Sequence, residues 1–169
     1  MIRFAAWRSI GSLALQCAAL IVLIAAFFIR LPQVAGLSMA PRIASGEFVL
    51  VDTLAYRFSS PRRGDIVAFR RSGTVIQTYI KRVIGLPGDR IRIVRGTVYV
   101  NGIALREPYV RHADTRSYPP IVVPPHELYV LGDNRPVSED SRAFGCIPES
   151  DVIGKAIAAV WPPERIGRL

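Results

Sequence analysis

The chain is 169 residues long, which is enough for one ordinary domain and a tether but too short for two independent cores. Its formal charge of +9 is spread from Arg3 to Arg168, and no run of five or more like charges occurs. This spacing argues against a nucleic-acid-binding arm. It favours a solvated basic face, which also suits anionic membrane lipid, and we expect no nucleic-acid partner.

The first element along the chain is a membrane-length apolar segment. Residues 10–29 contain no charged residue. As a helix rising about 1.5 Å per residue they would span about 30 Å, the thickness of the hydrocarbon core of a bilayer. A cleavable secretory signal is the alternative, but its apolar part is about 7–15 residues long, and a cut after Ala35 would put Gln33 where a small residue is needed. The sequence therefore favours an uncleaved signal anchor, a single transmembrane helix.

The charges that flank this segment predict its orientation. Arg3 and Arg8 precede it, whereas Arg30 alone borders its far side, so the positive-inside rule places residues 1–9 in the cytoplasm. Residues 30–169 then form an extracytoplasmic domain at the plasma membrane or, alternatively, at the inner membrane of an organelle.

From about Pro41 onward the pattern is mainly β, with short apolar runs separated by turn signals and no long stretch at helical spacing. Asn101-Gly102 predicts a tight hairpin turn. Residues 111–125 contain four prolines and are expected to form a mobile loop. Strands are expected over residues 47–52, 65–69, 74–84, 90–94, 97–100, 127–131 and 155–161.

Ser38 and Lys81 together suggest a serine hydrolase that uses an amine as its base. Only two of the 22 basic residues, Lys81 and Lys155, are lysines, and arginine cannot be deprotonated in a protein. Lys81 is the better candidate, because its apolar and β-branched neighbours would desolvate the ammonium and lower its pKa. The period of two along the strand also puts Lys81 and Arg82 on opposite faces.

A polar segment over residues 132–142 holds the remaining candidates. Asp133, Asp140 and Arg142 are expected to form ion pairs that brace this loop. Ser138 could offer its hydroxyl to Lys81 and hold the amine towards the nucleophile.

No disulfide, metal or other cofactor is expected. Cys17 lies in the apolar segment and Cys146 in the exported part, so the two are not expected to pair. His112 and His126 are 14 residues apart and have no second ligand at metal-binding spacing.

Four segments in the same order resemble type I signal peptidases, the membrane-bound Ser-Lys proteases that remove signal peptides from exported preproteins. The single anchor resembles the small forms of that family. The matching segments are Ser38-Met39-Ala40-Pro41 and residues 63–69, 79–89 and 132–142. The resemblance implies Ser38 as nucleophile, Lys81 as general base, Ser138 as the hydroxyl that orients Lys81, and Asp133, Asp140 and Arg142 as supporting residues.

The same resemblance implies how the substrate is held. The oxyanion would be bound by the Ser38 backbone N–H and the Gly36 region, where some members carry a serine in place of Gly36. Val34, Met39 and Ile80 would line two small apolar pockets, so cleavage is expected after small residues at −1 and −3. The expected partners are preprotein signal peptides and membrane lipid, and the protein is expected to be a monomer.

Three other readings stay open at this stage. A Ser-His-Asp hydrolase would need His112 or His126 near Ser38, and neither lies in a motif. A soluble Ser-Lys self-cleaving repressor would not carry an uncleaved anchor. A membrane-tethered β module that binds partners without catalysis is the non-enzymatic alternative, against which the joint presence of Ser38, Lys81 and Ser138 argues.

Overall fold

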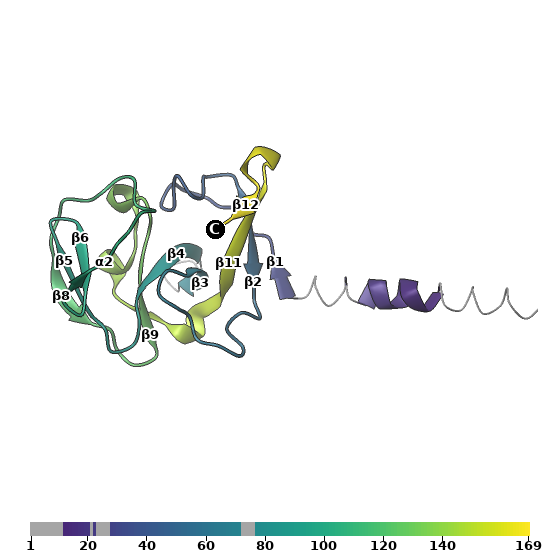
Figure 1. The fold of residues 1–169 in the computed structure, drawn as a ribbon, viewed down its shortest axis with the longest axis horizontal. Helices are drawn as coiled ribbons and strands as arrows, with labels where there is room; N and C mark the ends of the chain where they lie inside the picture. The colour runs from purple at the N-terminus through teal and green to yellow at the C-terminus, as the bar shows by residue number, and fades with distance from the viewer. Residues whose placement is uncertain (1–11, 21, 23–27, 72–76) are drawn as a thin grey trace, which may run out of the picture.

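The fold is that of a computed structural model, which describes residues 12–20, 22, 28–71 and 77–169. The predicted mainly β domain is confirmed. Two antiparallel sheets lie side by side, the larger nearer the N-terminal segment and the smaller at the far end (Figure 1).

The larger sheet has eight strands, and its strand β4 carries Ile80 and Lys81. Its order is β1-β2-β11-β3-β4-β9-β10, and β12 pairs with β11. The strands are β1 (Ile29–Arg30), β2 (Phe48–Asp52), β3 (Ile66–Arg71), β4 (Gln77–Gly85), β9 (Glu127–Leu131), β10 (Ile147–Pro148), β11 (Val152–Trp161) and β12 (Gly167–Arg168).

The smaller sheet has four strands in the order β7-β6-β5-β8. They are β5 (Arg90–Val94), β6 (Thr97–Val100), β7 (Ile103–Ala104) and β8 (Tyr118–Val122). The predicted hairpin at Asn101-Gly102 is confirmed: both residues have positive φ, and they join β6 to β7. Short helices complete the domain: α2 (Ser141–Phe144) and the 3₁₀ turns η1 (Arg135–Val137), η2 (Glu149–Asp151) and η3 (Pro163–Arg165).

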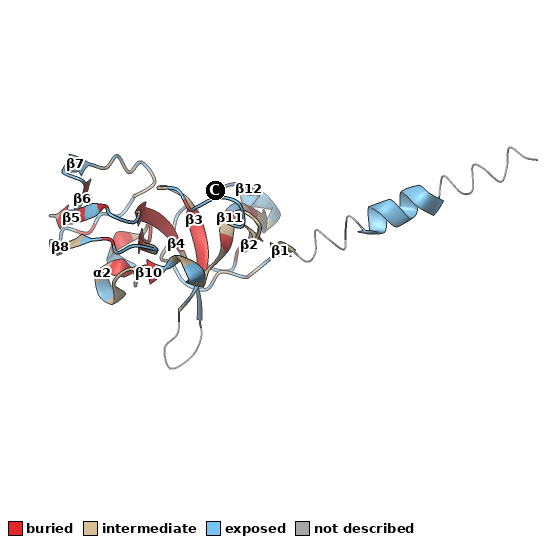
Figure 2. Cartoon of the chain, turned by 90° about the horizontal axis from the view of Figure 1, so that it is seen from below, coloured by how far each residue is buried: buried red, intermediate tan, exposed pale blue. Residues whose placement is uncertain are grey.

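Burial follows the alternation in the sequence. In β5 the two isoleucines are buried and the two arginines are exposed, as a sheet with one solvated face requires. Figure 2 shows the buried residues gathered in the strands of both sheets. The last five residues of β4, 81–85, are all buried, because this part of the strand lies between β3 and β9.

The prediction of a loop over residues 111–125 is wrong in part, because β8 occupies Tyr118–Val122 and pairs with β5. Pro119 and Pro120 lack the N–H that an inner strand would need on both sides. They are tolerated because β8 lies at the edge of the smaller sheet, where one side of the strand needs no partner.

Much of the predicted anchor over residues 10–29 lies outside the described residues, as does the whole of the segment 1–9. Residues 12–20 are helical, and Ile29 already belongs to β1. Within the described ranges, no helix is both long enough and apolar enough to cross a membrane.

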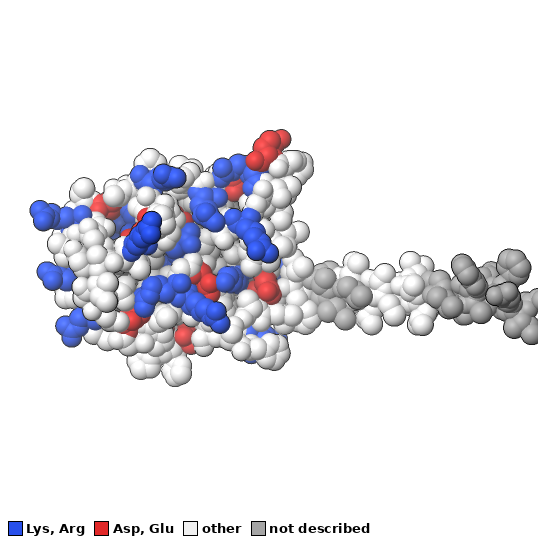
Figure 3. All heavy atoms as spheres, in the orientation of Figure 1, with Lys and Arg blue, Asp and Glu red and all other residues white. Residues whose placement is uncertain are grey.

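The basic residues are dispersed over the domain. Figure 3 shows lysine and arginine side chains scattered over one face among neutral and a few acidic ones. This agrees with a solvated basic face and gives no single tract on that face for a polyanion.

Candidate active site

The loop that carries Ser38 begins where the chain leaves the edge of the larger sheet. Val34 exchanges backbone hydrogen bonds with the two residues just before β2, donating to Glu47 O at 2.8 Å and accepting from Gly46 N at 2.8 Å. Gly36 follows with φ of +104°, a conformation that side chains disfavour, and turns the chain away from the sheet. Ser38 therefore lies just beyond a fixed extended segment.

Two contacts hold this loop from the side of the polar segment. Asn134 donates its backbone N–H to Ser38 O at 2.9 Å and its side-chain amide to Leu37 O at 3.1 Å. Met39, next to Ser38, is 1% exposed and packs into the core beneath β2. The position of Ser38 is thus fixed by backbone contacts on both sides.

The far end of the loop is held by the C-terminal turn, a contact that the sequence analysis missed. Arg165 donates to the buried carboxylate of Glu47 at 2.5 Å and to Pro41 O at 2.7 Å. Arg42, next to Pro41, donates to Arg168 O at 3.3 Å. The loop is therefore tied to the end of the chain as well as to the polar segment.

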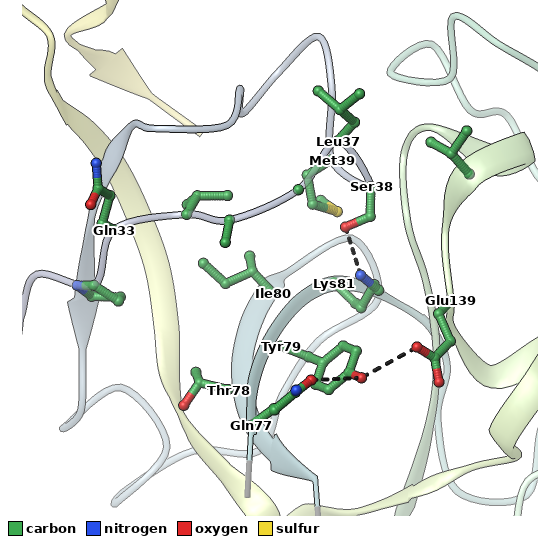
Figure 4. Close-up of a pocket in the computed structure, with 15 residues that line it drawn as sticks. Gln33, Leu37, Ser38, Met39, Gln77, Thr78, Tyr79, Ile80, Lys81 and Glu139 are labelled. Atoms are coloured by element: carbon green, nitrogen blue, oxygen red, sulfur yellow. Dashed lines mark hydrogen bonds between the residues drawn. The ribbon is translucent and has the colours of Figure 1, made fainter. Parts of the chain in front are cut away.

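The predicted pair meets: Lys81 Nζ donates to Ser38 Oγ at 2.6 Å (Figure 4). Lys81 is 3% exposed. Burial lowers the pKa of its ammonium to about 8, and Asp140 and Glu139 oppose that shift more than Arg142 assists it. The expected desolvation of Lys81 is confirmed, and a buried amine within hydrogen-bond distance of a serine hydroxyl can accept its proton.

Arg82 lies on the opposite face of β4, as predicted. Its guanidinium makes a bidentate pair with Asp133 at 2.8 and 2.6 Å, and it lies 4.0 Å over the ring of Tyr109. The charge of Arg82 is therefore compensated away from the amine of Lys81, and Asp133 supports the site through Arg82.

Ser138 Oγ is buried and has no hydrogen-bond partner among the described residues, so the predicted bond to Lys81 is not formed in this structure. The hydroxyl lies against Gly132, together with the carbonyl of Ser38. A methyl group added to Gly132 would fall 2.2 Å from Ser138 Oγ and 2.5 Å from Ser38 O. Gly132 thus lets the loop that carries Ser38 and the side chain of Ser138 approach each other closely.

Asp140 and Arg142 form the expected brace behind the site. The guanidinium of Arg142 donates to the two carboxylate oxygens of Asp140 at 2.7 and 2.8 Å. Asp140 also accepts the N–H of Gly132 at 3.0 Å and caps the N-terminus of α2. The pair therefore fixes the backbone at Gly132, one contact away from Ser38.

Two further carboxylates complete this brace and were missed. Asp114 accepts from Arg142 at 2.9 Å, and Glu107 accepts from Arg135 at 2.6 and 3.1 Å. The hydrogen bonds from Arg116 hold the pKa of Asp114 at about 2 against the effect of burial. In the sequence, these two carboxylates lie between β7 and β8 in no recognisable motif, so nothing indicated their partners.

A groove of about 530 Å³ leads to Ser38 and Lys81. Val34, Met39 and Ile80 line it and belong to one apolar cluster, whereas the two separate small pockets expected beside them stay a prediction. Its walls are the segment 32–38 and the edge of β4 over residues 77–81, where β9 does not reach because its pairing begins at Arg82. An extended peptide would therefore find a strand edge beside Ser38 and Lys81.

Of the two N–H groups that could bind an oxyanion, those of Gly36 and Ser38, only one lacks a hydrogen-bond acceptor among the described residues. The N–H of Gly36 donates to Ser45 Oγ at 3.2 Å, so it is engaged. The N–H of Ser38 has no acceptor among the described residues and remains available.

The known proteins that resemble this chain are signal peptidases. The family model described as "Signal peptidase, peptidase S26" matches residues 7–161. A probable signal peptidase I-2 of Synechocystis is 34% identical over 168 residues, covering 96% of this chain and 77% of that protein. Signal peptidase IB of Staphylococcus aureus is 35% identical over 172 residues, covering 89% of this chain and 87% of that protein.

A solved structure gives the same result. The crystal structure of a signal peptidase I from Enterococcus faecalis matches with a TM-score of 0.51 and 35% identity. The match covers 57% of this chain and 97% of that one.

Proposed function

The chain belongs to the signal peptidase family, peptidase S26, and we propose that it removes signal peptides from exported preproteins with Ser38 and Lys81 as a catalytic dyad. Members of this family are serine endopeptidases. The observation that carries the assignment of the dyad is the 2.6 Å contact between Ser38 Oγ and the buried amine of Lys81.

The mechanism follows from the protonation of Lys81. With a pKa of about 8, roughly 10% of the amine is neutral at pH 7, against roughly 0.03% at the ordinary lysine pKa. Neutral Lys81 takes the proton of Ser38 as Oγ attacks the scissile carbonyl, and the resulting ammonium returns that proton to the leaving amine. Water, activated by the again neutral Lys81, then hydrolyses the acyl-enzyme and frees the signal peptide.

The negative charge that develops on the carbonyl oxygen needs a donor. The N–H of Ser38 is proposed as this donor. It belongs to the residue that attacks, and it donates to no acceptor among the described residues. Ser138 is proposed to orient the ammonium once the proton has been transferred, which would give its buried hydroxyl a partner.

Substrate selection is proposed to rest on an added strand. A peptide lying in the groove beside residues 77–81 would alternate its side chains between the two faces of the larger sheet. Positions −1 and −3 would then face the apolar cluster of Val34, Met39 and Ile80. The apolar character of these three side chains supports uncharged residues at both positions, and we propose that these residues are small.

The predicted anchor would place the protease at the membrane with residues 30–169 outside the cytoplasm. A preprotein is held there by its own apolar signal, so both partners would be confined to one surface and their effective concentration would rise.

The first test is the cleavage of a preprotein with a small-x-small site by the detergent-solubilised full chain. We expect the parent to cut after the −1 residue, and Ser38→Ala and Lys81→Ala to be inactive although folded. Lys155→Ala is the matched control, because Lys155 is the only other lysine and lies on β11, paired with Asp65. An inert parent, or an active Lys81→Ala variant, would refute the proposal.

Specificity has its own test. A bulky residue such as tryptophan at −1 should block cleavage of an otherwise identical preprotein. Efficient cutting of that substrate would show that the pockets beside Ile80 do not select position −1.

A further inference from the structure

The two faces of β4 present different chemistry to the groove. Ile80 packs with Met39 and Val34 on one face, whereas Tyr79 belongs to a different core cluster on the other. Figure 4 shows Ile80 projecting on the side of Met39 and the hydroxyl of Tyr79 directed towards Glu139. An apolar wall and a polar wall therefore flank the same strand edge.

Strand geometry assigns substrate positions to these walls. In an extended peptide, residues two apart share a face, so −1 and −3 lie on one side and −2 on the other. If −1 and −3 face Ile80, the side chain at −2 must face Tyr79 and Glu139. This step rests on the proposed function, in particular on a peptide that lies beside β4.

The polar wall presents a carboxylate to the groove. Glu139 accepts from Tyr79 Oη through Oε2 at 3.3 Å and from Arg71 through Oε1 at 3.3 Å. Glu139 and Tyr79 line the groove, whereas Arg71 does not, since its guanidinium lies 4.4 Å over the ring of Phe144. The ion pair is therefore oriented, with its negative end nearer the substrate.

We propose that Glu139 selects the residue at position −2 of the substrate and favours a cationic side chain there over an anionic one. A lysine or arginine at −2 would approach the carboxylate with its ammonium or guanidinium, and the Tyr79 hydroxyl could accept a further hydrogen bond. A glutamate or aspartate at −2 would bring a second carboxylate to the same wall.

The effect is modest because the side chain of Glu139 is 56% exposed and already has a partner in Arg71. Exposed charge pairs each change an equilibrium by a small factor, and here an attraction is compared with a repulsion. We expect kcat/KM for lysine at −2 to exceed that for glutamate about threefold to tenfold at low salt. Since the pair is exposed, the ratio should fall towards one at about 1 M salt.

The experiment uses three peptides that differ only at −2, with lysine, glutamine or glutamate. The parent, Glu139→Gln and Glu139→Lys full-length enzymes are compared in detergent at one pH. Glu139→Gln should bring the lysine-to-glutamate ratio close to one, and Glu139→Lys should invert it. Glu164→Gln, an exposed glutamate in η3, is the control and should keep the parent's ratio.

Taking the ratio within each enzyme removes a confounding effect. Glu139 also raises the pKa of Lys81, so its loss changes the rate for every peptide, but by the same factor. Equal rates of the parent on all three peptides would overturn the role of Glu139 and leave the peptidase assignment intact, as would a ratio that persists in Glu139→Gln. If no peptide is cut at all, both the inference and the proposed function fail.

Discussion

Gly132 offers a sharp test of how closely the site is packed. Ordinary contacts of a Cβ atom begin at 3.4 Å, whereas a Cβ at this position would lie 2.5 Å from Ser38 O, an overlap of 0.9 Å, and closer still to Ser138 Oγ. Rotation of the Ser138 hydroxyl would still leave Ser138 Cβ 2.6 Å away, and Ser38 O is backbone that is already bonded to Asn134. Gly132→Ala should therefore displace the loop that carries Ser38 by nearly 1 Å.

Such a displacement has a predictable cost in rate. A misplacement of about 1 Å between reacting groups can cost about 100-fold, so kcat/KM of Gly132→Ala should fall by that order. The assay is the cleavage of a fluorogenic small-x-small peptide, with rates divided by the folded fraction from circular dichroism at the assay temperature.

The matched control is Gly154→Ala. Its Cβ would fall 2.3 Å from Asp52 O, a clash as severe as that at Gly132, but in the pairing of β11 and β2 rather than at the site. Both variants should lose stability, and only Gly132→Ala should lose activity per folded molecule. The reasoning fails if folded Gly132→Ala stays within threefold of the parent, or if the two variants lose activity equally.

Three further outcomes are expected. Because only neutral Lys81 can accept the proton, and its pKa is about 8, kcat/KM should level off above pH 8 and fall about tenfold per pH unit below it; a rate flat from pH 9 to pH 5 would contradict this role. Asp140→Ala should lower the free energy of unfolding in urea by about 3–5 kcal/mol, because it leaves buried Arg142 without its main partner, and a loss below about 1 kcal/mol would count against the brace. Burial raises the pKa of Cys146 to about 11. In a Cys17→Ser background, the alkylation of Cys146 at pH 8 should therefore be on the order of 100-fold slower than that of an exposed thiol, a rate that stopped-flow or mass spectrometry can measure. Alkylation at the rate of an exposed thiol would show that the Cys146 thiol is accessible.

The strands were predictable where a simple alternation dictates burial. Polar and apolar residues alternate over Arg90–Val94, and the observed strand has the predicted bounds. Tyr118–Val122 was missed, because its two prolines suggest a loop and only the completed sheet shows that the strand lies at an edge.

The contact between Ser38 and Lys81 was predictable for a different reason. The chain has only two lysines, so Lys155 was the one alternative to Lys81 as the amine base. The apolar neighbours of Lys81 in its strand predicted its burial. The partners of Arg142 and Arg135 were not predictable, because Asp114 and Glu107 each lie 28 residues away along the chain. Such pairs depend on how two loops meet in space, which local pattern does not encode.

Among the described residues, no strand pairs with residues 77–81 of β4 on the side away from β3, and this also bears on solubility. A free strand edge is a template for association between copies, and proteins commonly protect such edges with a covering segment. Here the segment 32–38 forms the opposite wall, so the edge of residues 77–81 lies within a groove. To pair with this part of β4, the edge of another folded sheet would have to enter the groove. The same wall would therefore spare folded proteins from cleavage and the protease from aggregating with itself.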